Sequence, residues 1–325
     1  MDEPQEQTSW VRSECESVAG MKRFYHEAMA TTFEVIVIHE DGRYAQQAAA
    51  AAFREVDRLE GELSRFVENS DISRINSLPA DQPLVVGPDA FECLRLSVQL
   101  YGETNGAFDV TVGSLLGCWR NDDGSARTPT QDEIDLARRH TGGRLIELDE
   151  VEHTVCLAEP VKIDLGGVGK GYAVDRMAEL LRDWSIDVAL IHGGYSSVLA
   201  LEAPADMKGW PLTLSHPGGG GVLVRPRMKG RALSGSGRRK GGHIIDPRTA
   251  KPAEGRVAAW SSAPDAATGD ALSTAFMIMQ ADEIKQYCLR RPDVLAMTIV
   301  EEGGGDVRQD RILRFGNWRG ELHVE

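Results

Sequence analysis

The sequence predicts an α+β fold. Strand and helix patterns follow one another along the 325 residues without the regular alternation that produces a doubly wound parallel sheet. A mainly β stretch from about residue 188 to residue 262 separates the helical patterns of the first half from two further helices near the end. The composition, 42% hydrophobic and 26% charged, is that of an ordinary globular protein that can bury a sizeable core.

The first elements are predicted to be a strand and three helices. Residues 33–38 (FEVIVI) are rich in β-branched and aromatic types, which favour strands. Apolar residues recur at helical spacing over 44–63, and a second helix over 88–103 begins at a proline. A third helix begins at Thr130, where Glu133 completes a capping-box pattern.

The middle and the end of the chain are predicted to be mainly β with interspersed helices. Short strands at 145–148, 154–158 and 161–165 lead to a glycine-rich turn and a helix over 171–184. Five more strands are expected at 188–191, 198–202, 211–215, 222–225 and 257–262. Helices over 270–280 and 281–290 then precede a hairpin over 294–315 that turns at Gly303-Gly304-Gly305.

The net charge excludes two classes of partner. Lys and Arg number 36 against 50 Asp and Glu, so the formal net charge is −14 and the surface as a whole repels nucleic acid and anionic lipid. The charge is uneven, because the segment between Met207 and Ile245 contains eight Lys or Arg and no acid. For this basic segment, a solvated surface and a local attraction for an anionic ligand both stay open.

The N-terminus and the cysteines carry no targeting or metal-binding signal. Residues 1–20 are acidic and polar, which predicts a flexible arm ahead of a single domain over 21–325. No run of about 18 apolar residues occurs, so we expect a cytoplasmic protein that does not insert into membranes. The five cysteines lack CxxC and Cys/His spacing, so free thiols are expected in place of disulfides or a zinc site.

A glycine-rich turn forms the first candidate site. The segment KIDLGGVGKGY (162–172) reads as a strand that ends in a turn and opens a helix, where exposed N–H groups stabilise a phosphate. It is neither a P-loop, since Lys170 is followed by glycine, nor a dinucleotide fingerprint, since the glycines alternate from Gly167 to Gly171. A tight structural turn and a phosphate contact are both compatible with the segment.

Asp270 and Thr274 form a second candidate site. They stand four residues apart in TGDALSTAFMIM (268–279), so on a helix their oxygens lie on one face, one turn apart. A carboxylate, a hydroxyl and a nearby carbonyl are the hard donors that Mg²⁺ prefers. The alternative is an aspartate favoured by its own helix N-terminus and a threonine that bonds back to its own turn.

Three further residues are candidates on weaker grounds. His243 heads HIIDPRTAKP (243–252) beside the basic segment, where it is either a general base or a structural histidine. Phe66 and Phe108 are isolated aromatics in polar, turn-rich surroundings. Each either stacks on a flat heterocycle or packs in the core.

The order and spacing of several motifs resemble the ApbE family of flavin transferases. The motifs, in chain order, are MATTFEVIV, LSRF with DISRIN, GAFDVTVG, KIDLGGVGKGYAVDRM, HGG, ALSGSG, HIIDPRTAKP and DALST. The resemblance runs from about Met29 to Gln280. Three departures from the family pattern are Ala30 and Ala250, where glycine is usual, and the short segment 237–242 that precedes His243.

The resemblance implies a fold and a ligand set. The fold would be a T-fold-related α+β architecture in two lobes, with mixed or antiparallel sheets, flanking helices and FAD in the cleft between the lobes. Mg²⁺ at the FAD pyrophosphate would be bound by the side chains of Asp270 and Thr274 and the main-chain carbonyl of Gly167. Positions that match FAD contacts in the family are Met29, Phe66, Ala107, Phe108, Asp109, Asp164, Lys170 and Ile245.

The resemblance also implies a reaction. FMN would pass from FAD to a Ser or Thr hydroxyl of an acceptor flavoprotein, with release of AMP. Asp270 and Lys170 would act on the phosphates, and His243 is the candidate that deprotonates the acceptor hydroxyl. A metal-dependent FAD pyrophosphatase and an FAD-binding protein without turnover are the two alternatives.

Overall fold

The computed structural model describes residues 11–13, 18, 20–121, 124–205, 207–217, 221–238, 244–302, 309–318 and 323–324. Three of the predictions fall on other residues. The candidate base His243 and the expected turn at 303–305 lie outside the described residues, as does most of the predicted arm over 1–20.

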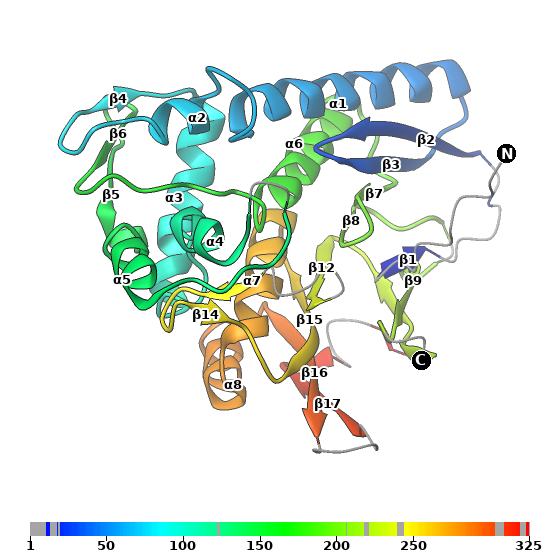
Figure 1. Cartoon of the computed structure of the whole chain (residues 1–325). Coiled ribbons are helices and arrows are strands. Elements are labelled where there is room, and N and C mark those ends of the chain that lie inside the picture. Colours follow the sequence, from blue (N-terminus) through cyan, green and yellow to red (C-terminus); the bar gives the residue numbers. More distant parts are fainter. Residues whose placement is uncertain are drawn as a thin grey trace, which may run out of the picture.

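The core of the fold is an eight-stranded sheet in which every neighbouring pair is antiparallel, in the order β17-β16-β15-β12-β8-β7-β3-β2 (Figure 1). Its strands are β2 (Met21–Ala28), β3 (Thr31–Ile38), β7 (Ala189–Gly193), β8 (Ser197–Ala200), β12 (Arg231–Gly237), β15 (Arg256–Ala263), β16 (Leu295–Glu302) and β17 (Gln309–Phe315). The central strands β7 and β8 are buried along their whole length, which explains why all their residues except His192 are apolar or small.

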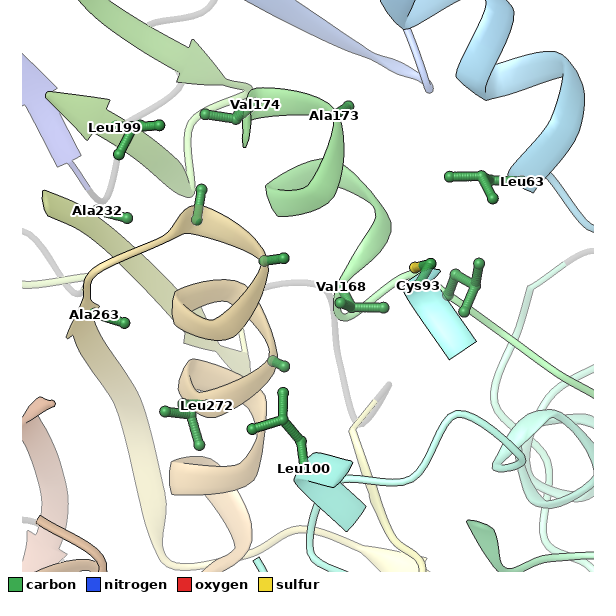
Figure 2. Packing of buried hydrophobic residues seen from close by; sticks show 14 of the residues in the cluster. Leu63, Cys93, Leu100, Val168, Ala173, Val174, Leu199, Ala232, Ala263 and Leu272 are labelled. Carbon is green, nitrogen blue, oxygen red and sulfur yellow. The ribbon is translucent and has the colours of Figure 1, made fainter. Parts of the chain in front are cut away.

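Helices cover one face of this sheet. Helix α7 (Ala266–Ile278) packs on β12 and β15, and α6 (Gly169–Asp183) lies between α7 and α1 (Gly42–Leu63). Figure 2 shows α7 between Ala232 and Ala263 of the sheet on one side and Val168 and Leu100 on the other. Nearly every residue of α7 is buried, so this helix is part of the core.

The other face of the sheet packs against a smaller sheet. That sheet contains β1 (Val11–Ser13), β9 (Trp210–Ser215), β10 (Val222–Val224), β11 (Pro226–Met228) and β18 (His323–Val324). A second hydrophobic cluster fills the space between them and includes Trp210 of β9 and Trp260 of β15, both fully buried. The large sheet is therefore covered on both faces.

The remaining elements form a second group beside the large sheet (Figure 1). They are α2 (Asp71–Ile75), α3 (Pro88–Glu103), α4 (Gly113–Trp119), α5 (Gln131–Arg139), a 3₁₀ turn (Gly143–Leu145), the sheet β4-β6-β5 (Leu84–Val85, Thr154–Leu157 and Ile146–Asp149), the hairpin β13-β14 (Ile245–Asp246 and Lys251–Pro252), and α8 (Ala281–Arg290). The predicted α+β class with antiparallel sheets and flanking helices is confirmed.

Most of the predicted elements are present, and one is wrong. Helix α3 has the predicted bounds, and Thr130 and Glu133 form the predicted capping box of α5. The segment 161–165 is not a strand, because its backbone forms hydrogen bonds with the surrounding loops. Asp164 N donates to Val110 O at 2.7 Å, and Ile163 N donates to Asn76 Oδ1 at 2.5 Å. Its one bridge joins Lys162 to Val112.

Several elements were not predicted, and the longest of them are β2, β12 and α4. Strand β12 (RALSGSG) lacks the usual β-branched residues, because α7 packs very closely on it. A Cβ added at Gly269 of α7 would lie 3.3 Å from Ser234 Oγ of β12. Small side chains are thus a packing requirement at this contact.

Candidate functional site

Asp270, Lys170 and Gly167 lie at the start of α6, which turns from one end of the large sheet also approach. Strand register places the β2–β3 turn at Met29 and the β7–β8 turn at Gly194 at the same end of the sheet. A Cβ added at Gly194 would lie 2.5 Å from Thr31 Oγ1, and one at Gly193 would lie 3.5 Å from the carbonyl O of Lys170. The glycines let these turns approach α6 closely.

Asp270 binds the N-terminus of α6. Its Oδ2 accepts the Gly171 N–H at 3.2 Å and lies 3.3 Å from Lys170 Nζ, and the residue is 3% exposed. Lys170 Nζ also donates to the carbonyl O of Gly166 at 3.2 Å. Helix α7 begins at Ala266, so Asp270 lies in its second turn. The favourable effect of a helix N-terminus on a carboxylate falls off within the first turn, so the alternative that Asp270 is stabilised by its own helix N-terminus is wrong.

Thr274 and Gly167 lie next to each other. A Cβ added at Gly167 would lie 3.3 Å from Thr274 Oγ1 and 3.3 Å from Phe108 Cε2. Thr274 Oγ1 is 3.5 Å from the carbonyl O of Asp270 in its own helix, a long hydrogen bond. Ser236 Oγ of β12 lies 3.3 Å from the same hydroxyl and 2.7 Å from Ser273 Oγ.

These residues fit a magnesium site chemically. The Asp270 carboxylate, the Thr274 hydroxyl and the Gly167 carbonyl are hard oxygen donors, and the structure brings their residues to one place. In the part of the chain that the structure describes, no three His, Cys, Asp or Glu side chains form a metal-binding group. The candidate set contains one carboxylate, as expected for an ion that also uses water and substrate phosphate as ligands.

Asp164 holds the glycine-rich turn. Its Oδ1 accepts the Gly166 N–H at 2.7 Å, and its Oδ2 pairs with Arg65 Nε at 2.9 Å. The Arg65 guanidinium carbon in turn lies 4.1 Å from the centroid of the Phe66 ring, which is 81% exposed. Phe66 is therefore not a core residue, and its ring is open to a ligand.

Four other predicted residues are buried, so any ligand contact would come through their backbone. They are Ala107, Phe108, Asp109 and Ile245, between 1% and 6% exposed. Phe108 belongs to the main core, which leaves no open ring face for stacking. Asp109 accepts hydrogen bonds from Thr111 N and Oγ1 at 2.9 and 2.6 Å, and burial raises the pKa of its carboxyl.

Sequence reasoning missed two neighbours of the site, Arg65 and Ser236. Both lie inside motifs of the sequence, LSRF and ALSGSG. The sequence carries a signal for Arg65, since it is the only cation in LSRF and directly precedes Phe66. No signal pointed to Ser236, because its proximity to Thr274 depends on how α7 packs on β12.

Three cations of the basic segment have partners outside the site. Lys229 pairs with Glu202 at 2.5 Å and Arg238 with Glu301 at 2.6 Å. Arg231 is 9% exposed and donates to the carbonyl O of Asp293 at 2.6 Å. These contacts favour a structural or surface role over binding of an anionic ligand for Lys229, Arg231 and Arg238.

Ala30 and Ala250 have left-handed backbones, with φ of 55° and 59°. A Cβ there costs about 1 kcal/mol relative to glycine. Ala30 is exposed, so Ala30→Gly removes this cost without losing buried surface and should stabilise the protein by about 1 kcal/mol. Ala250 is buried, and its methyl group contributes about 0.8 kcal/mol, which nearly offsets the backbone cost. Ala250→Gly should therefore leave the free energy of unfolding almost unchanged. Urea unfolding measures both; a destabilised Ala30→Gly would contradict the left-handed turn.

The sequence matches the model of the ApbE family over residues 29–299. A FAD:protein FMN transferase of Klebsiella pneumoniae is 26% identical over 296 residues, which span 86% of this chain and 84% of the relative. One of Treponema pallidum is 28% identical and spans 83% and 85%. Among solved structures, the ApbE protein of Thermotoga maritima has a TM-score of 0.81 at 27% identity and covers 93% of this chain and 99% of its own.

In the described residues, no helix combines the length and the apolar character needed to cross a membrane.

Proposed function

Since the chain belongs to the ApbE family, we propose that it transfers FMN from FAD to a Ser or Thr hydroxyl of an acceptor protein and releases AMP. The main support for this proposal is that Asp270, Thr274 and Gly167 lie close together at the N-terminus of α6, next to Lys170. Oxygen donors for a divalent cation and the Lys170 ammonium for a phosphate then lie at the same place.

The pyrophosphate would lie at the start of α6. Asp270, Thr274 and the Gly167 carbonyl would hold Mg²⁺, which when bound offsets the negative charge that develops as a P–O–P bond breaks. The Lys170 ammonium would stabilise the phosphate oxygens. Asp164 would keep the glycine-rich turn in shape through Gly166 and Arg65.

The acceptor hydroxyl would attack the phosphorus on the FMN side. A phosphoester bond forms between the acceptor oxygen and the FMN phosphorus, the bond from that phosphorus to the bridging oxygen breaks, and AMP leaves with that oxygen on its phosphate. The hydroxyl proton would pass to a base, for which His243 is the candidate. The exposed ring of Phe66, with Arg65 over it, would offer a stacking surface to one of the two heterocycles of FAD.

An assay that follows two products tests the proposal. The purified protein is incubated with FAD, Mg²⁺ and a candidate acceptor protein, while AMP release and in-gel flavin fluorescence of the acceptor are measured. AMP together with a fluorescent acceptor band is the expected result. AMP without a fluorescent band would identify a FAD pyrophosphatase, and neither product in the presence of bound FAD would identify a flavin-binding protein.

A further inference from the structure

Helices α6 and α7 run antiparallel and touch at three contacts spaced one turn apart. Asp175 accepts the N–H groups of Ala266 and Ala267, Asp270 accepts the N–H of Gly171, and Gly167 adjoins Thr274. The positions are four residues apart on each segment, 167, 171 and 175 against 274, 270 and 266. A shift of one helix along the other would change all three contacts together.

Asp175 makes the shortest of these contacts. Its two hydrogen bonds to the first turn of α7 are 2.7 and 2.8 Å long, whereas the bond between Asp270 and Gly171 is 3.2 Å long. Gly171 allows the close approach, since a Cβ there would overlap the carbonyl O of Ala266.

The N-terminus of α7 already has a capping residue of its own. Asp265 accepts the Thr268 N–H at 2.7 Å, as an N-cap aspartate does. A second carboxylate at the same helix end is repelled by the first, so capping alone does not account for Asp175. What distinguishes Asp175 is that it comes from α6 and so joins the two helices.

We propose that Asp175 is a positioning residue that sets the register of α7 against α6 and thereby places Asp270 and Thr274 opposite Gly167. The inference rests on the proposed metal-dependent reaction. Asp175 does not touch the donor atoms, and it acts through the helix backbones. Outer residues that orient metal ligands commonly change metal affinity by about 10- to 100-fold when replaced.

Binding of Mn²⁺ to the full chain with FAD tests this role without measuring turnover. Free Mn²⁺ is followed by its electron paramagnetic resonance signal. Asp175→Asn, which keeps the shape but loses one acceptor, is expected to raise the Mn²⁺ midpoint about tenfold. The matched control Asp265→Asn removes a carboxylate from the same helix end whose hydrogen bond to Thr268 lies within α7, so its midpoint should stay within about twofold of wild type.

Two results would overturn the inference. One is an unchanged midpoint in Asp175→Asn, and the other is an equal rise in both variants, which would show a general effect of capping. If wild type itself binds no Mn²⁺, the proposed metal site fails, and the inference fails with it.

The unaltered protein provides a measurement that does not depend on folding of a variant. Coupling between sites is reciprocal, so Mn²⁺ and FAD together should slow amide hydrogen exchange at Ala266 and Ala267 at least severalfold. If the exchange rates of these two amides in the presence of FAD were the same with and without Mn²⁺, the proposed role of Asp175 would be contradicted.

Discussion

Asp270→Ala is expected to lower the rate of AMP release from FAD by about a thousandfold. The change removes the single carboxylate of the candidate magnesium site, the partner of Lys170 and the acceptor of the Gly171 N–H. Loss of a group that stabilises developing charge typically costs two to three orders of magnitude, and a metal ligand has a comparable effect. Initial rates of AMP release at several Mg²⁺ concentrations measure the loss.

Two further variants separate charge from structure. Asp270→Asn keeps an oxygen that accepts the Gly171 N–H but has no charge, so it should be nearly as inactive as the alanine variant. Asp265→Asn alters the same helix outside the site and should retain activity within about twofold. Unchanged AMP release in Asp270→Ala would show that the metal assignment is wrong.

Asp175 is expected to make stability depend on pH between about 4 and 7. Burial, together with the nearby charge of Asp265, raises the pKa of Asp175 from 3.8 to about 7. Between these values the folded protein holds a proton that the unfolded chain has released, so the free energy of unfolding falls as pH rises and levels off above about 7. The shift corresponds to as much as about 4 kcal/mol.

The comparison with Asp175→Asn isolates this effect, because the other titrating groups are common to both proteins. Urea unfolding at pH 4.5 and pH 8 gives the free energy of unfolding of each protein. We expect the variant to become more stable relative to wild type as the pH rises, since it carries no buried charge at pH 8. A difference that does not change with pH would show that the pKa of Asp175 is close to its ordinary value.

The same variant then has two opposite expected effects, a gain in relative stability at pH 8 and a weaker affinity for Mn²⁺. Such opposition is common at functional sites, where residues are retained at a cost in stability. Urea unfolding of the variant at pH 8 shows whether a loss of metal binding at that pH could come from poor folding.

Much of the fold could be predicted from local patterns. Helix α3 starts at Pro88, α5 starts with a capping box at Thr130, and the burial of β3 matches its apolar run. These features depend on neighbouring residues in the chain, and the sequence displays them directly. The segment 161–165 has the alternating apolar pattern of a strand because Val161, Ile163 and Leu165 point into the main core, but its backbone bonds to loops, which no local pattern reveals.

The sequence by itself determined the residue types of the site: the glycine-rich turn, the Asp270 and Thr274 pair and Lys170, four or fewer residues apart within their own segments. Only the tertiary structure decided which partners each of these residues contacts and which side chains are buried. Asp270 binds the start of a helix about one hundred residues earlier in the chain, Phe66 is exposed while Phe108 is buried, and Asp175 joins two helices. The physical reason is that hydrogen-bond partners and burial at these positions come from packing between distant elements, whereas residue spacing constrains only the geometry within one element.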